Sequence, residues 1–481
     1  MRLKTSLLFF YALFLSFLPA MVAQEAPATD TLPSALLPED RHRPNLIERE
    51  QFNQGLMLQP LDLIQGRLPS LMTFKTGSNP TGQYDFRIRG VKSFGVNRPL
   101  VVVDGVPLNG METLHPSDIA SIEVLADGGS SNWYGARGGN GVLMIKTKKG
   151  VAGPAQINYQ VLRSSDRLAR APQIMDADTY REAGLSSILN NIDGETDWWG
   201  EITRRRAQSL VHNLSISGGN QQTTYYVSLG FDDVEGIAEY SEMDRLNARL
   251  NLEHKAFKDR LNLQFTMNSN QRTGSGIENE AFAQATRFDP TKPIRTDDPT
   301  FGQYGGYYER PIFGNYNPVS ITEQIDLDQK LNALYSQFQV SYNLLPWLKL
   351  GWTYALHDEE GQNHYFSTKS SYYAQWYNGR AQSQLSNRKN RYTAGFLQLD
   401  QHTEDWDFSF LAQAYDQRLE NDFINLQVKD FLTDAFSYHN LGAAQSTALG
   451  DSDISSGKSV RTNRSFSGHL NLAYRQRFGV N

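Results

Sequence analysis

The stretch LVVVDGVPLNG, residues 100–110, places apolar runs on either side of Asp104 and Gly105. An Asp-Gly pair readily adopts the positive φ angles of a two-residue turn, so this stretch predicts a β-hairpin. Further along, YGARGGNGVLMIKTKKG, residues 134–150, again joins a glycine-rich turn to an apolar run, and Val142 to Thr147 is predicted to be a strand. We therefore expect residues 46–150 to form a small α+β domain of short strands and tight turns.

Beyond residue 150 the chain changes to a regular alternation of apolar and polar residues. In LNLQFTMN, residues 261–268, and in WLKLGWTYALH, residues 347–357, apolar side chains recur at every second position. Similar segments begin at Tyr225, Leu246, Asp407 and Phe466. This period predicts strands with one apolar face, and about ten tilted residues suffice to cross a bilayer. Residues 151–481 are expected to supply about ten antiparallel transmembrane strands of a β-barrel.

The loops distinguish a membrane barrel from a soluble β-sandwich, which the alternation alone also fits. Short joints are predicted at 218–222, 254–259, 344–347 and 402–405, and long ones at 166–206, 273–328, 359–388 and 420–462. Short turns at one rim and long loops at the other are typical of outer-membrane barrels. The mean hydropathy of −0.51 agrees, because a barrel wall needs apolar residues on only one face.

The amino terminus has the pattern of an export signal. A basic start precedes the apolar stretch Leu7 to Leu18, and small residues follow, so residues 1–23 are predicted to be a secretory signal peptide. An anchoring helix is the less favoured alternative, because the apolar stretch is short for a bilayer span. Residues 24–45, rich in proline, alanine and aspartate without periodicity, are predicted to be a flexible leader.

Composition excludes several classes of site. The chain of 481 residues has no cysteine, which excludes disulfides, thiolate zinc sites and thiol nucleophiles. A net charge of −6 without a long basic block argues against nucleic acid. The nine histidines lack metal-binding spacing, and Tyr134 to Gly141 leads into a strand without the lysine of a phosphate loop. Since turn chemistry explains carboxylates such as Asp104 and Asp118, we expect no enzyme activity, metal or cofactor.

The opening module resembles the plug domain of SusC/RagA-type TonB-dependent outer-membrane transporters. The resemblance is carried by PLVVVDGVPL (99–108) and by HPSDIASIEVLADGGSSNWYGARGGNGVLMIKTKKG (115–150). It starts near residue 50, includes FRIRGV (86–91), and continues into HNLSISGGNQQTTYYVSLGFDDVEGI (212–237). Past about residue 275 only the strand pattern and fragments such as NYNPV remain. The plug-motif residues are Arg89, Gly90, Asp104, Gly105, Asp118, Tyr134, Gly135, Arg137, Gly138, Asn140 and Gly141.

The resemblance implies a plug seated in a barrel of about 22 strands in the outer membrane of a Gram-negative bacterium. It also implies import of oligosaccharide or peptide nutrients, powered by the TonB complex, with a SusD-like surface lipoprotein as a lid and outer-membrane lipid around the barrel. A non-transporting accessory component that binds a lid lipoprotein or another barrel chain is the alternative. A secreted hydrolase or binding sandwich would rest only on generic β periodicity and on the aromatic residues of the loops.

Four features depart from the family pattern. The leader is too short for the small β-sandwich that many members carry, and DTLPSALL, residues 30–37, is only a weak match to a TonB-binding segment. Ala126, Asp127 and Gly128 stand where members commonly have Lys-Asp-Ala. The predicted strands number fewer than half of the family's barrel. We therefore expect a fragment, a sheet closed by another chain, or a narrower barrel with little room for a plug.

Three predicted loops are rich in tyrosine and tryptophan: residues 196–201, 301–317 and 370–379. Exposed aromatic rings suit sugars, peptides or a partner protein, whereas packing within the loops or a belt at the lipid headgroups explains them equally well. The candidate contact residues are Trp198, Trp199, Tyr307, Tyr308, Tyr373 and Trp376.

Overall fold

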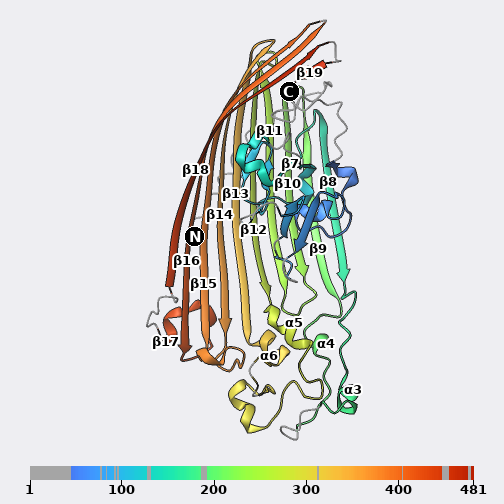
Figure 1. Ribbon diagram of the computed structural model, residues 1–481, viewed down its shortest axis with the longest axis vertical. Helices are drawn as coiled ribbons and strands as arrows, with labels where there is room; N and C mark the ends of the chain where they lie inside the picture. Colours follow the sequence, from blue (N-terminus) through green and yellow to red (C-terminus); the bar gives the residue numbers. More distant parts are fainter. Residues whose placement is uncertain are drawn as a thin grey trace.

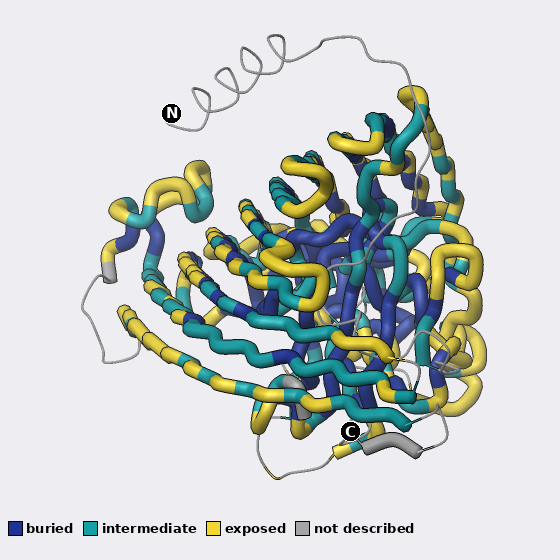
Figure 2. The backbone as a smooth tube through the Cα atoms, turned by 90° about the horizontal axis from the view of Figure 1, so that it is seen from above, coloured by how far each residue is buried: buried dark blue, intermediate teal, exposed yellow. Residues whose placement is uncertain are grey.

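The computed structural model describes residues 45–480 except 76–78, 83, 92–93, 95–96, 127–131, 186–191, 311, 313, 404, 447–453 and 475–477. The predicted signal peptide and most of the leader, like Asp127 and Gly128, lie outside the described residues. A small unit, residues 45–150, sits against the concave face of one large curved sheet (Figures 1 and 2). We call these two parts the plug and the wall. No helix in the described part of the chain is long and apolar enough to cross a membrane.

The plug is built on a five-stranded sheet in the order β1-β6-β7-β4-β5. In that order the strands are Leu46–Glu48, Ile119–Leu125, Val142–Thr147, Leu100–Val103 and Val106–Leu108, and only β4 and β7 run parallel. A separate hairpin joins β2 (Leu71–Lys75) and β3 (Tyr84–Ile88). The described helical turns of the plug are η2 (Arg49–Gln51), η3 (Pro60–Ile64), η4 (Pro116–Asp118) and η5 (Asn132–Asn140).

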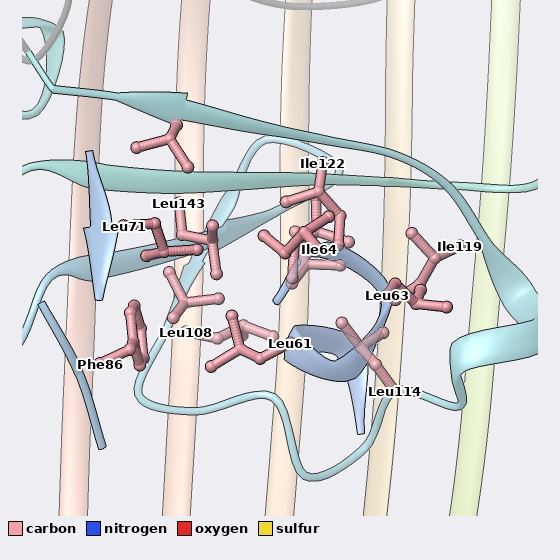
Figure 3. Packing of buried hydrophobic residues seen from close by; sticks show 14 of the residues in the cluster. Leu61, Leu63, Ile64, Leu71, Phe86, Leu108, Leu114, Ile119, Ile122 and Leu143 are labelled. Carbon is pink, nitrogen blue, oxygen red and sulfur yellow. The ribbon is translucent and has the colours of Figure 1, made fainter. Parts of the chain in front are cut away.

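The predicted Asp-Gly hairpin and the predicted strand that follows the glycine-rich turn are both present. Asp104 and Gly105 have φ angles of 46° and 85° between β4 and β5. At Gly141, with φ of 90°, a Cβ atom would come within 2.9 Å of the Ile88 side chain, so glycine lets β7 start close to β3. The apolar core lies between the sheet and η3 and includes Leu61, Ile64, Phe86, Leu108, Ile122 and Leu143 (Figure 3).

The wall is one antiparallel sheet whose long strands pair in chain order. They are β8 (Gly153–Asp166), β9 (Ala207–Gly219), β10 (Thr223–Glu235), β11 (Glu242–Ala256), β12 (Leu261–Gly276), β13 (Ile325–Leu345), β14 (Leu348–Ser367), β15 (Arg380–His402), β16 (Trp406–Phe431) and β18 (Ile454–Tyr474). Short β17 (Ala444–Ser446) pairs with β16, and β19 (Phe478–Val480) pairs with β18. Among the described strands the order β19 to β8 does not close on itself, so the wall is a partial barrel and not a narrow closed one.

The wall strands are longer than predicted. β16 has 26 residues, whereas about ten tilted residues cross a bilayer, so the wall continues well past one membrane thickness. Short turns join β9 to β10, β11 to β12, β13 to β14 and β15 to β16 at one rim, as predicted. Of the long segments at the other rim, 368–379 and 432–453 are shorter than expected, because β14, β15, β16 and β18 extend into them.

The segments at the other rim contain most of the remaining helices (Figure 1). They are α3 (Ala177–Glu182), α4 (Trp198–Glu201), α5 (Asn279–Ala285), η6 (Pro299–Tyr304), α6 (Pro318–Glu323), η7 (Gln375–Tyr377), η8 (Ser437–His439) and η9 (Leu441–Ala443). Side-chain caps start several of them, as when the Asn317 side chain accepts from the Val319 and Ser320 amides at the start of α6.

The two faces of the wall have the reverse of the polarity found in a soluble sandwich. On β11 the polar residues are buried toward the plug: Arg245, Asn247, Arg249 and Asn251. The apolar residues that alternate with them, such as Leu246 and Leu252, are exposed on the outer face. β12 repeats this, since Gln264, Thr266, Asn268 and Asn270 are buried while the alternating Phe265 and Met267 are less so. A polar interior with an apolar exterior is the pattern of a barrel wall in lipid, and it disfavours the soluble sandwich.

Candidate functional site at the contact between plug and wall

Asp118 ends the short turn η4 and points from the plug to the wall. A proline starts this turn, and the His115 side chain caps it by accepting a backbone hydrogen bond. The Asp118 carboxylate accepts hydrogen bonds from Tyr226 Oη at 3.0 Å, Ser228 Oγ at 2.6 Å and Asn247 Nδ2 at 2.9 Å. One buried carboxylate thereby joins the plug to the neighbouring strands β10 and β11.

Beside it, a buried ion pair of the wall also holds the plug. Arg245 Nε on β11 donates to Asp232 on β10 at 2.7 Å, and Arg245 Nη1 donates to the backbone oxygen of Leu58 at 2.6 Å. His115 Nε2 lies 3.2 Å from both carboxylate oxygens of Asp232. A buried carboxylate is unfavourable unless opposite charge and hydrogen bonds compensate it. Arg245 therefore stabilises Asp232 and anchors the plug backbone at the same time.

Asp104 combines a turn contact with a wall contact. Its carboxylate accepts from the Thr147 backbone amide at 3.0 Å and from the Thr147 hydroxyl, which ties the β4–β5 turn to the end of β7. Nη2 of Arg249 on β11 forms an ion pair with the same carboxylate at 3.4 Å. Sequence reasoning named Asp104 and Asp118 as plug-motif residues and explained their carboxylates by turn chemistry and strand-edge solvation, and the structure adds their wall partners.

Backbone oxygens of the plug receive further hydrogen bonds from wall amides. The Pro107 oxygen accepts from Asn390 Nδ2 at 3.1 Å and from Gln417 Nε2 at 2.8 Å. The Asp104 oxygen accepts from Gln337 Nε2 at 3.2 Å. Pro107 lies in β5, an edge strand of the plug sheet, so these side chains cover an edge that would otherwise lack partners.

The contact is therefore largely polar, and most of its acceptors lie on the plug and most of its donors on the wall, although Arg137 of the plug donates to Gln417 of the wall. Apolar packing adds to it, because Tyr335, Ala355, Tyr392 and Ala394 of the wall belong to the core cluster of the plug. A hydrogen bond exchanged for water contributes only about 0.5–1.5 kcal/mol net, whereas apolar surface costs about 25 cal/mol per Å² to expose. Many directional polar contacts fix the plug in one position, yet water can replace each of them when the plug moves. Within the described ranges no cluster of three or more metal-ligating side chains occurs. The contacts between plug and wall form a largely polar seat for the plug.

The remaining plug-motif residues shape the plug's backbone. Arg89 and Gly90 turn the chain after β3 with φ angles of 54° and 78°, and Gly135, with φ of 56°, kinks η5. The other motif residues lie in η5 or directly after it: Tyr134, Arg137, Gly138, Asn140 and Gly141. Arg137 of this group makes a hydrogen bond to the wall, donating to Gln417. The functional role assigned to the motif as a set stays a prediction.

The long loops pack into a separate apolar cluster at their rim, which we call the loop core. Its buried members are Trp198, Ile202, Ala238, Ile277, Ala281, Ala285, Phe288, Phe301, Tyr307, Tyr308, Tyr316, Val319, Ile321, Ile325 and Tyr372. The indole of Trp198 meets the Phe288 ring edge-on at 4.9 Å and donates to the backbone oxygen of Asp289 at 3.1 Å. These contacts join two loops that are distant in sequence, and the cluster as a whole also includes Ala238 and Tyr372 from two further rim segments.

This core decides where the candidate contact residues lie. Trp198, Tyr307 and Tyr308 are buried in it, which fits the alternative of packing within the loops. Trp199 and Tyr373 are partly buried against it, and Trp376 is 73% exposed. The contact role of these residues stays a prediction, and the surface available for it is centred on Trp376.

A carboxyl group is enclosed in the loop core. Glu309 accepts hydrogen bonds from the Asn317 backbone amide at 2.9 Å and from the Ser320 hydroxyl. Burial raises the pKa of Glu309 to about 7, because the charged form loses hydration that two hydrogen bonds only partly replace. This side chain therefore changes charge near neutral pH.

Sequence reasoning missed one plug residue, His115, and the wall residues that hold the plug. His115, Asp232, Arg245, Asn247 and Arg249 were not singled out, because their contacts join segments more than one hundred residues apart, such as Asp118 with Asn247. In the sequence, the wall residues among them were marked only by their position on the polar face of strands whose apolar face is exposed.

Comparison with known proteins gives a consistent result. Residues 44–142 match the family described as TonB-dependent receptor plug domain. SusC, a TonB-dependent receptor of Bacteroides thetaiotaomicron, is 30% identical over 283 residues, which cover 55% of this chain and 28% of SusC. TonB-dependent receptor P26 of Formosa agariphila is 25% identical over 457 residues, covering 90% of this chain and 45% of the relative. The chain thus spans less than half of each of these relatives.

Solved structures show the same fold. The RagAB peptide transporter superposes with a TM-score of 0.74 at 18% identity, covering 90% of this chain and 53% of that chain. The unliganded ferric citrate transporter FecA gives a TM-score of 0.52 at 12% identity over 90% of this chain and 54% of that chain. With its plug-domain match, its similarity to SusC and its partial barrel with the fold of RagAB, the chain is similar to TonB-dependent receptors of the SusC/RagA type over the part that it spans.

Proposed function

We propose that this chain forms the plug and adjoining barrel wall of an outer-membrane importer for oligosaccharide or peptide nutrients. In this proposal residues 1–23 direct export, residues 24–45 are the leader, residues 46–150 are the plug domain and residues 151–481 are the barrel part. The TonB complex supplies the energy, and a SusD-like lipoprotein covers the loop rim. The observation that carries the proposal is the polar seat of the plug against an inward-facing polar wall.

The plug sheet is arranged so that tension from the amino-terminal side reaches a weak strand first. β1 is joined to β6 by three residue pairs, whereas β6 is joined to β7 by six. Tension ahead of Leu46 therefore separates β1 before it disturbs the centre of the sheet. β6 begins at Ile119, directly after Asp118, so movement of this edge acts next on the hydrogen bonds to β10 and β11.

The loop rim is the proposed place for cargo or lid contacts. Trp376 exposes its indole, and Trp199 and Tyr373 offer the accessible parts of their rings. Flat aromatic faces with a hydrogen-bonding edge suit both sugar rings and peptides. Trp198, Tyr307 and Tyr308 would act indirectly, by fixing the loop core that presents the others.

The test is uptake by cells that produce the protein from its full reading frame. Labelled maltooligosaccharides and labelled tryptic peptides are offered separately, in strains with and without TonB function. We expect TonB-dependent uptake of one cargo class, and loss of gating when residues 46–150 are deleted. Uptake that is unaffected both by loss of TonB and by the deletion would refute the proposal.

A further inference from the structure

The outer face of the wall, away from the plug, contains an apolar groove across β15, β16 and β18. The groove has a volume of about 560 Å³, and we call it the outer groove. The residues on its outward side are Gly395, Leu397, Ala412, Ala414, Phe466 and Gly468. They form two cross-strand rows, Leu397 to Ala412 to Gly468 and Gly395 to Ala414 to Phe466. Small residues form its floor, and Phe466, 88% exposed, stands at one side.

The orientation of the groove follows from the alternation along β15. Phe396, between Gly395 and Leu397, is buried on the plug side, where it packs close to Gly351. Residues on either side of it must therefore face outward. Trp352 lies opposite Gly395 on the neighbouring strand β14 and is also exposed, so the groove belongs to the apolar outer belt of the wall.

Two arginines face each other just beyond the groove. Arg391 on β15 is directly opposite Arg418 on β16, both are exposed, and both point outward, four residues from Gly395 and Ala414 respectively. Like charges directly opposite each other on neighbouring strands are destabilising. Arg418 Nε donates to Glu420 at 2.8 Å, and Arg391 lies close enough to interact electrostatically with the same carboxylate.

The acidic groups nearby leave this arginine pair short of negative charge. Asp416 is paired with Arg464 at 2.6 Å, and Glu420 is shared between Arg418 and Lys458. Lys389 lies one outward position beyond Arg391, between Asp358 and Glu420 on the adjacent strands. The single carboxylate of Glu420 therefore serves three cations, Arg391, Arg418 and Lys458, and positive charge exceeds negative charge around the arginine pair.

We propose that the outer groove and the arginine pair bind one membrane lipid whose headgroup carries an anionic phosphate. The acyl chain lies along the small-residue floor, where hydrocarbon fills apolar surface, and the phosphate accepts hydrogen bonds from Arg391 and Arg418. Four residues of strand, about 13 Å, separate the groove from the arginines, which suits a headgroup above its chain. This inference rests on the proposed outer-membrane location, and charge complementarity selects a lipid over a neutral occupant.

Native mass spectrometry of the delipidated full-length protein in neutral detergent tests the site. Phosphatidylglycerol and phosphatidylcholine with the same acyl chains are added in turn. We expect preferential retention of phosphatidylglycerol. Arg391→Gln combined with Arg418→Gln should weaken this retention about thirtyfold, since each basic residue near a headgroup contributes about 1 kcal/mol. Arg163→Gln is the matched control, because Arg163 is an exposed outward cation on the distant strand β8.

A second variant tests the groove. At Gly468 a Cβ atom meets only Phe410, at 3.7 Å, so Gly468→Leu fills the groove while the strand stays intact. It should reduce retention of both lipids. Displacement of the lipid by inorganic phosphate, together with unchanged lipid retention in Gly468→Leu, would indicate a site for free anions and overturn the proposal. A loss of phosphatidylglycerol retention in Arg163→Gln equal to that in the double arginine variant would overturn it as well. Failure to insert into phospholipid vesicles would instead refute the membrane location itself.

Discussion

Replacing Asp118 by asparagine tests whether the plug is held by its polar seat. In the native contact both carboxylate oxygens accept hydrogen bonds, one from Tyr226 and Ser228 and the other from Asn247. Asparagine keeps one oxygen for the two hydroxyls, but its amide group then faces the amide donor of Asn247. Asp118→Asn therefore removes the charge from two hydrogen bonds and leaves a third donor without an acceptor.

The magnitude follows from these three contacts. Hydrogen bonds to a charged group contribute about 1 kcal/mol more than neutral ones, and a buried unsatisfied donor costs about 1–3 kcal/mol. The sum for Asp118→Asn is about 4 kcal/mol of plug attachment. If the free energy of plug release falls by about 2 kcal/mol per molar urea, the urea concentration at the midpoint of release should fall by about 2 M.

The assay uses the absence of cysteine from the chain. A single Glu50→Cys substitution in the exposed turn η2 accepts an environment-sensitive dye that reports plug release during a urea titration in detergent. Asn247→Asp added to Asp118→Asn supplies an acceptor for the new amide and should recover most of the midpoint. Asp85→Asn is the control, because Asp85 pairs only with the half-exposed Arg87 of the plug. An unchanged midpoint in Asp118→Asn, or no recovery in the double variant, would show that the seat does not hold the plug.

Three further predictions concern other parts of the structure. Arg245→Ala should lower the unfolding free energy by about 3–5 kcal/mol in urea titrations, because Asp232 is left buried without its ion-pair partner. Gly141→Val should cost more than about 1 kcal/mol in the same assay, since φ is 90° and a Cβ would lie 2.9 Å from β3. Because the pKa of Glu309 is raised, the folded loop core binds a proton at this carboxyl group more tightly than the unfolded chain does. Its stability is therefore greatest below the ordinary pKa of 4.5 and falls by about 3 kcal/mol as pH rises to about 7. Hydrogen exchange of residues 277–324, corrected for intrinsic rates, should show this fall, and Glu309→Gln should abolish it.

Local features of the fold could be predicted from the sequence because their causes are local. The hairpin at Asp104 and Gly105 follows from the φ preferences of two residues, and the two faces of β12 follow from a period of two. Strand length could not be predicted this way. On β14 the apolar alternation ends at Leu356, yet the ladder continues to Ser367, because backbone pairing does not require apolar outward side chains.

The candidate site was predictable only in part, for a different reason. Asp118 was named from a family resemblance, but its partner Asn247 depends on how the plug is placed against the wall. The loop aromatics show the same limit. Whether Trp198 is exposed depends on Phe288 and Asp289 in another loop, and no pattern around Trp198 records that packing.

One turn of the wall links the loop core to the plug. Residues 236–241 connect β10 to β11 at the loop rim, and Ala238 belongs to the loop core. Arg204 fixes this turn by donating from Nη1 to three of its backbone oxygens. On its other side the Ser241 hydroxyl lies 3.3 Å from Asn79 Oδ1 of the plug. Since the turn is held at several points, we expect a shift of the loop core to move the plug as well instead of being absorbed by loose chain. Under the proposed function, cargo at the rim and tension at β1 would act on the same polar seat from opposite ends.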